Sequence, residues 1–85
     1  MLGGDQEKAK YYFDTALRLT QEKFLMVHVY YAKSVAIQTL NEELFDRLLT
    51  RVDTTSIDIL PSVRLQNAIA KKKGALLRDR KSEYF

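Results

Sequence analysis

The side chains of this sequence that could take part in acid–base or metal chemistry are few and far apart. His28 is the only histidine, and the chain has no cysteine. The nearest carboxylate along the sequence, Glu22, is six residues away from His28. A metal site needs several such ligands together, and acid–base catalysis needs paired groups whose environments separate their pKa values. We therefore expect no catalytic residue, no metal site and no cofactor, and we interpret His28 as structural or partly exposed.

Basic residues are concentrated at the C-terminal end of the chain. Residues 1–60 carry a net charge of −2, whereas residues 61–85 carry +5. Lys71 and Lys72 are therefore candidates for contacts with a partner or ligand, with a solvated helix face as the other interpretation. A small basic domain that binds nucleic acid or a membrane surface is the alternative function. Against nucleic acid, residues 71–73 fan over about 200° of a helix, and no nucleic-acid-binding motif accompanies them.

Two pairs of adjacent tyrosines are a second set of candidates. Neighbouring residues on a helix point about 100° apart, so one member of each pair can pack while the other lies at the boundary with solvent. A tyrosine combines an apolar ring with a polar tip, which suits contacts with a ligand or a partner protein. We select Tyr11 and Tyr30 for this role, with a position at the edge of the core as the other interpretation.

The spacing of apolar residues predicts an all-α fold of antiparallel helical hairpins, with four helices near 5–20, 24–39, 42–53 and 61–78. The whole chain is expected to form a single helical domain, because 85 residues suffice for one. A turn at residues 3–5 is expected to precede the first helix. Its apolar face should comprise Ala9, Tyr12, Phe13, Ala16 and Leu17, which follow the pattern of the second helix of a tetratricopeptide repeat.

The other three helices differ in how much of their surface is apolar. The second is apolar around its circumference, so it should be the most buried, with neighbours on both sides. The third should be capped by Asn41 and should bury Leu44, Phe45, Leu48, Leu49 and Val52. The fourth should bury Leu65, Ala68, Ile69, Ala75 and Leu76, with Asn67 beside this stripe. Asn67 is expected either to bond to backbone or to contact a ligand or partner, and Phe13 and Phe45 are the predicted core anchors.

Five segments together resemble one known family. In order, "LGGDQEKAKYYFDTAL", "KFLMVHVYYAKSVA", "NEELFDRLL", "LQNAIAKKK" and "EYF" are similar to the C-terminal part of the TRAP transporter T component. This is a tetratricopeptide-like periplasmic protein associated with tripartite ATP-independent periplasmic transporters. The resemblance runs from about Leu2 to Phe85. It implies a helical-repeat fold, no catalysis, a periplasmic location, and partnership with the solute-binding subunit of the transporter, with room for a small ligand.

The sequence departs from the family pattern in three respects. It lacks the signal segment with its lipidated cysteine, so this chain does not provide a membrane contact through a lipid anchor. It also lacks the helices expected before Gly3. Finally, it has Gly74 where alanine is expected. We therefore expect a C-terminal piece of a longer helical-repeat protein. The first helix would then lack one neighbour, which would leave Tyr11 and Leu19 exposed and would favour self-association, as a two-fold dimer.

Overall fold

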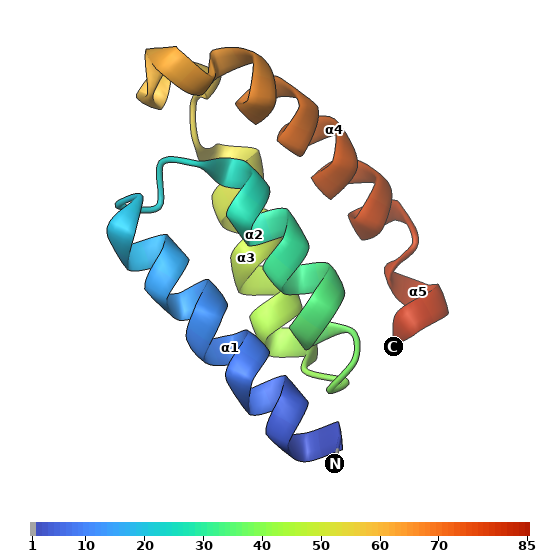
Figure 1. Cartoon of the computed structure of the whole chain (residues 1–85). Coiled ribbons are helices and arrows are strands. Elements are labelled where there is room, and N and C mark those ends of the chain that lie inside the picture. Colours follow the sequence, from blue (N-terminus) through green and yellow to red (C-terminus); the bar gives the residue numbers. More distant parts are fainter. Residues whose placement is uncertain (1) are drawn as a thin grey trace.

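The computed structural model describes the backbone of residues 2–85 and the side chains of residues 6–85. The described backbone contains helices and no strand, which confirms the all-α prediction. The elements are α1 (Leu2–Leu19), α2 (Leu25–Tyr31), the π-helix η1 (Ala32–Ala36), α3 (Glu42–Thr54), the 3₁₀ turns η2 (Ile57–Ile59) and η3 (Pro61–Val63), α4 (Arg64–Asp79) and α5 (Lys81–Tyr84). The long helices alternate in direction along the chain, as expected of antiparallel hairpins (Figure 1).

The rod formed by α2 and η1 lies at the centre of the fold, in contact with α1, α3 and α4 (Figure 1). Leu25, Val29 and Ala32 on this rod are at most 1% exposed, and the predicted central position is confirmed. The predicted regular helix over 24–39 is wrong in its second half. There the Ile37 N–H donates to the Ala32 carbonyl at 3.0 Å, an i→i−5 bond that widens the turn, and the rod ends at Ala36.

The helix α1 packs on the central rod through one narrow face. The ring of Phe13 stacks on that of Tyr31 with centroids 5.2 Å apart, and the Tyr31 hydroxyl donates to Asp14 Oδ1 at 2.8 Å. Phe13 is only partly buried, so it anchors the edge of the core rather than its centre. The predicted burial of Tyr12 is wrong: this residue is 68% exposed, because only one helix covers α1 and Tyr12 points about 100° away from Phe13.

The start of α1 also differs from the prediction. The backbone of Gly3 and Gly4 already belongs to the helix, which begins at Leu2, so the turn expected there is absent. The side chain of Asp5, the last residue of the expected turn, lies outside the described side chains. At its other end, α1 stops at Leu19, and a tight turn leads into α2.

The helix α3 has the predicted cap and core face. Asn41 Oδ1 accepts a hydrogen bond from the Leu44 N–H at 3.1 Å. The five predicted apolar residues of α3 are all at most 7% exposed. Phe45 is fully buried and lies edge-on to the rings of Tyr84 and Phe85, at 6.1 and 5.1 Å between centroids. These ring contacts, with ion pairs from Lys81 Nζ to Glu42 (3.0 Å) and Asp46 (2.9 Å), hold α5 against α3.

The predicted core face of α4 is wrong. Leu65, Ile69 and Leu76 are 71%, 41% and 63% exposed, and α4 instead buries Asn67, Ala70, Gly74 and Leu77. The small residues let α4 approach closely: a Cβ on Gly74 would lie 3.3 Å from Val52 Cγ1. Leu65, Ile69 and Leu76 therefore lie on the outer face of α4, where no other described element covers them.

Candidate functional site

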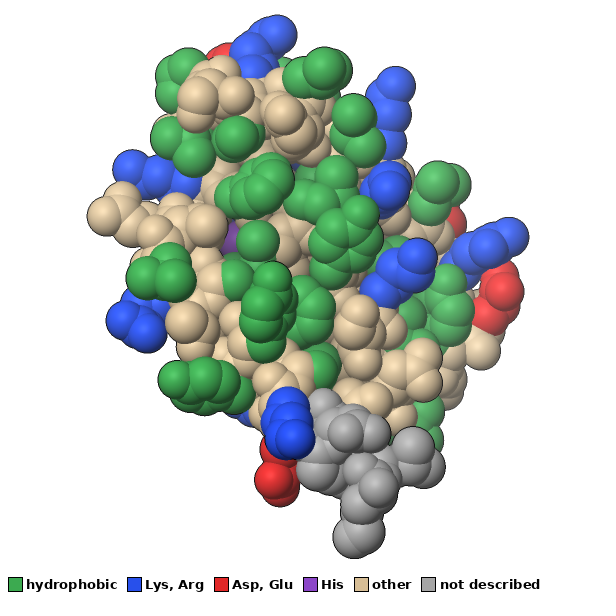
Figure 2. Space-filling model, viewed as in Figure 1, with side chains coloured by type: hydrophobic (Ala, Val, Ile, Leu, Met, Phe, Trp, Pro, Cys, Tyr) green, Lys and Arg blue, Asp and Glu red, His purple; other side chains and the backbone are tan. Residues whose placement is uncertain are grey.

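The outer face of α4 combines exposed apolar side chains with cations. Leu65, Ile69, Lys72 and Leu76 follow one another at helical spacing on this side, which points away from the core. Figure 2 shows hydrophobic side chains interspersed with Lys and Arg side chains on the side of the molecule where α2 and α4 lie. Several large exposed apolar residues close together are a common mark of an interaction surface.

A groove of about 260 Å³ adjoins this face, between the α2–η1 rod and α4. We call it the α2–α4 groove. Val29 and Leu77, both buried, lie at its floor, and Leu76 connects it to the outer face of α4. Its lining is completed by two tyrosines and three basic residues: Tyr30, Lys33, Lys73, Arg80 and Tyr84. The groove therefore has an apolar floor and a basic, aromatic rim.

The rim has an uncompensated positive charge. Lys73 Nζ lies 5.8 Å from the centroid of the Tyr30 ring, a cation–π contact that leaves its charge unneutralised. Among the described side chains, none makes an ion pair with Lys33 or Lys73, and the Arg80 Nε is 3.7 Å from Glu83 Oε2. No carboxylate lines the α2–α4 groove. The site thus presents three cations beside apolar surface.

The residues selected from the sequence lie in different parts of the molecule. Tyr30, 45% exposed, is on the groove, while Tyr11, 73% exposed, is on α1. Lys71 Nζ donates to the Asp53 carbonyl at 2.9 Å, so it points toward α3, and Lys72 points to solvent. With Lys73 beside α2, consecutive lysines point in three directions, and this arrangement does not favour the nucleic-acid alternative.

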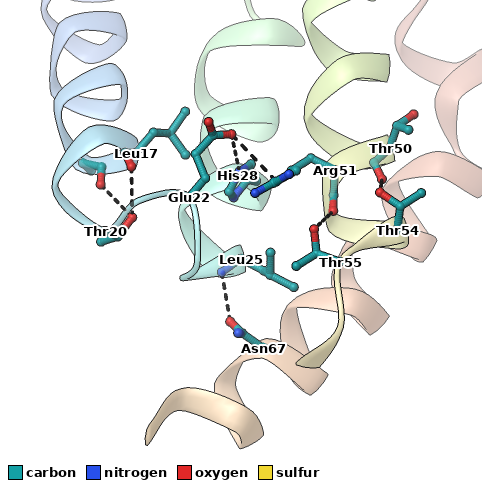
Figure 3. A network of polar contacts seen from close by, with 11 residues as sticks. Leu17, Thr20, Glu22, Leu25, His28, Thr50, Arg51, Thr54, Thr55 and Asn67 are labelled. Carbon is teal, nitrogen blue, oxygen red and sulfur yellow. Dashed lines mark hydrogen bonds and ion pairs between the residues drawn. The ribbon is translucent and has the colours of Figure 1, made fainter. Parts of the chain in front are cut away.

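Asn67 is fully buried, and both ends of its amide bond to the backbone at the start of α2. Figure 3 shows the bond to Leu25. Its Oδ1 accepts from the Leu25 N–H at 2.9 Å, and its Nδ2 donates to the Lys23 carbonyl at 3.0 Å. Because α4 carries Asn67, these bonds fix the position of α4 against the start of α2. Of the two interpretations of Asn67, bonding to backbone is the one observed.

A second polar cluster ties the α1–α2 turn to α3 (Figure 3). Gln21 and Glu22 both have a positive φ, 55° and 58°, and this turn directs the Glu22 carboxylate back toward the bundle. Glu22 Oε1 lies 3.4 Å from His28 Nε2 and 3.9 Å from Arg51 Nε. Burial lowers the pKa of His28 from its ordinary value, although Glu22 opposes this shift. His28 is 1% exposed and is neutral at pH 7, which fits a structural role.

Within residues 6–85, no group of three potential metal ligands lies close together, and no described helix has the length and apolar character required to span a bilayer. Sequence reasoning missed Lys33, Lys73, Arg80 and Tyr84 as members of one site. A signal was available in part, because Lys73 and Arg80 are seven residues apart, a spacing that places two residues on the same side of a helix. Their meeting with Lys33 depends on how α4 docks, which the apolar pattern predicted wrongly.

A family model described as "TRAP transporter T-component" matches residues 1–85, the whole chain. No curated protein and no solved structure matches it.

Proposed function

Because this chain belongs to the TRAP transporter T-component family, we propose that it is a non-catalytic interaction module that binds the solute-binding subunit of the transporter. The docking surface would be the α2–α4 groove with the outer face of α4. Family membership supports a role in transport with other transporter components, and the specific partner and surface are our proposal. A tetratricopeptide-like arrangement and a periplasmic location belong to the same proposal.

The observation that carries the proposal is the orientation of α4. Asn67, its small residues and Leu77 face the core, whereas Leu65, Ile69 and Leu76 face outward. Burying a side chain of this size stabilises a protein by about 1.5–3 kcal/mol. The isolated chain forgoes this free energy at Leu65, Ile69 and Leu76, because they remain exposed. A partner protein that covers this face would recover that free energy.

The exposed flank of α1 supports a second contact. Tyr11, Tyr12 and Leu19 are 73%, 68% and 71% exposed and come from one helix. We propose that this flank mediates self-association of the chain, separately from the docking surface on α4.

The α2–α4 groove is large enough for one or two side chains or a small ligand of that size.

The test of partner binding is a calorimetric titration of the intact chain with the purified solute-binding subunit of the same transporter. Leu76→Asp places a charge in the centre of the docking surface, so we expect affinity to fall by about tenfold or more. Leu40→Asp is the matched control, because Leu40 is 72% exposed and does not line the groove. Absence of binding by the unmodified chain, or equal loss in both variants, would contradict the proposal.

A further inference from the structure

We propose that the α2–α4 groove receives an acidic amphipathic helix of a partner protein. An apolar side chain of that helix would enter the groove, and flanking carboxylates would pair with Lys33, Lys73 and Arg80. This inference rests on the proposed function for the identity of the partner, and it adds the chemistry by which the partner is recognised.

The positive charge of the rim favours an occupant that carries negative charge. The described lining of the groove contains three cations and no carboxylate, and the basic residues come from both walls. Lys33 lies on η1 and Lys73 lies on α4, while Arg80 is the residue that directly follows α4. Like charges this close together repel one another, so an anionic occupant relieves repulsion as well as forming ion pairs. Charge complementarity of this kind raises association rates and excludes partners of the wrong sign.

The walls of the groove determine the backbone conformation of the occupant. Both walls are helices, whose backbone N–H and C=O groups are already bonded within each helix. An extended peptide would find no edge to pair with, and its own backbone groups would be desolvated without partners. A helix satisfies its own backbone and binds through side chains alone, as in other helix-in-groove complexes.

The spacing on α4 determines the pattern of the occupant. Lys73 and Arg80 are seven residues apart, which is about two turns or roughly 10.5 Å along the axis. Leu76 lies between them and faces the groove. A partner helix with carboxylates two turns apart and an apolar residue between them matches this pattern when it lies along α4. The small volume of the groove admits the apolar side chain and not the whole helix.

The experiment uses two synthetic helical peptides and the ¹⁵N-labelled intact chain. One peptide carries a central leucine with glutamates two turns apart around it, and in the second peptide glutamines replace those glutamates. We expect the acidic peptide to shift the amide resonances of Tyr30, Lys73, Leu76 and Arg80, and to bind about tenfold or more tightly than its glutamine counterpart, with weaker binding at high salt. Equal affinities, no binding, or shifts confined to α1 would overturn the inference.

Charge reversal provides the matched control within the chain. Lys73→Glu should weaken binding of the acidic peptide by about tenfold. Arg47→Glu reverses the same charge on an exposed residue of α3 that lines neither the groove nor the outer face of α4, and it should change the affinity by less than about twofold. An equal effect of both variants would show only a general attraction of an acidic peptide to a basic chain and would overturn the inference. Both variants should retain the unfolding midpoint of the unmodified chain, because both side chains are exposed.

The two proposals can fail separately. If the solute-binding subunit binds and Lys73→Glu leaves its affinity unchanged, the proposed function stands and the acidic-helix inference is wrong. If the acidic peptide binds the groove but the solute-binding subunit does not bind the chain, the chemistry of the groove stands and the proposed function is wrong.

Discussion

Gly74 and Val52 bring α4 and α3 close together: a Cβ added to Gly74 would lie 3.3 Å from Val52 Cγ1. Glycine within a helix costs about 1 kcal/mol relative to alanine, so its presence here is explained by this close approach. Gly74→Ala would gain helix propensity and lose a little packing, and we expect a change within about 1 kcal/mol. Gly74→Leu should destabilise by about 2 kcal/mol or more, because the added atoms meet Val52 and Leu49.

Urea titration of both variants would measure these free energies of unfolding. A neutral Gly74→Leu would show that α4 can move away from α3 without loss, which would contradict the close packing described above.

Substitution of Asn67 should separate its hydrogen bonds from its size. Asn67→Ala leaves the buried Leu25 N–H and the partly buried Lys23 carbonyl without their side-chain partner, and we expect a loss of about 2–4 kcal/mol. Asn67→Asp keeps the acceptor, loses the donor and adds a buried charge, so it should be at least as destabilising near pH 7. An aspartate variant as stable as the unmodified chain in thermal unfolding would show that the bond to Lys23 contributes nothing.

The two phenylalanines that we predicted from the sequence as core anchors should contribute unequally to the free energy of unfolding. Phe45 is 0% exposed, so Phe45→Ala should cost about 3–5 kcal/mol. Phe13 is only partly buried, and Phe13→Ala should cost less, about 1–3 kcal/mol, mainly through the loss of stacking on Tyr31. Chemical denaturation of the two variants side by side measures this difference, and equal losses would contradict the ranking.

The stability of the fold should depend on pH through His28. Its pKa is lowered in the folded state by burial, whereas in the unfolded chain it lies near the ordinary 6.5. The unfolded state therefore binds more protons below that value, and the unfolding free energy should fall as pH decreases from 6.5 toward the lowered pKa, with no change from this group above 6.5. Glu22 offsets part of this loss, because its carboxylate favours the protonated imidazole.

The control is His28→Gln, which removes the titrating ring. Unfolding free energies measured between about pH 7.5 and 5.5 should show a smaller slope in this variant. Identical slopes would mean that other groups, and not His28, determine the pH dependence in that range.

Self-association through the α1 flank predicts a dependence on Leu19 and Tyr12. Sedimentation equilibrium of the unmodified chain should show a species larger than the monomer, and Leu19→Asp or Tyr12→Asp should shift it toward monomer, because both residues are exposed on one side of α1. A monomer at all concentrations would contradict this part of the proposal.

The sequence predicted α3 well and α4 poorly for the same reason. An apolar stripe marks the core face only when large apolar residues pack against the neighbouring helices, as Leu48 and Val52 of α3 do. In α4 the small residues Ala70 and Gly74 pack against the neighbours, and apolar periodicity therefore indicated the outward side. The bonds of Asn67 join residues 42 and 44 positions apart, and no local pattern encodes them. Tyr30 was selected from its residue type alone. The grouping of basic residues around it could not be predicted, because it depends on the orientation of α4 against α2 and η1.

The bond from the Leu25 N–H to Asn67 also has a consequence for motion. Leu25 opens α2, where a helix normally leaves its first N–H groups without an internal partner, and here the partner is a side chain on α4. Exchange of this amide hydrogen with deuterated water therefore requires the N-terminal half of α4 to separate from α2, even while α1, α2 and α3 stay together. Its protection factor would report how often the last long helix detaches, separately from unfolding of the whole chain.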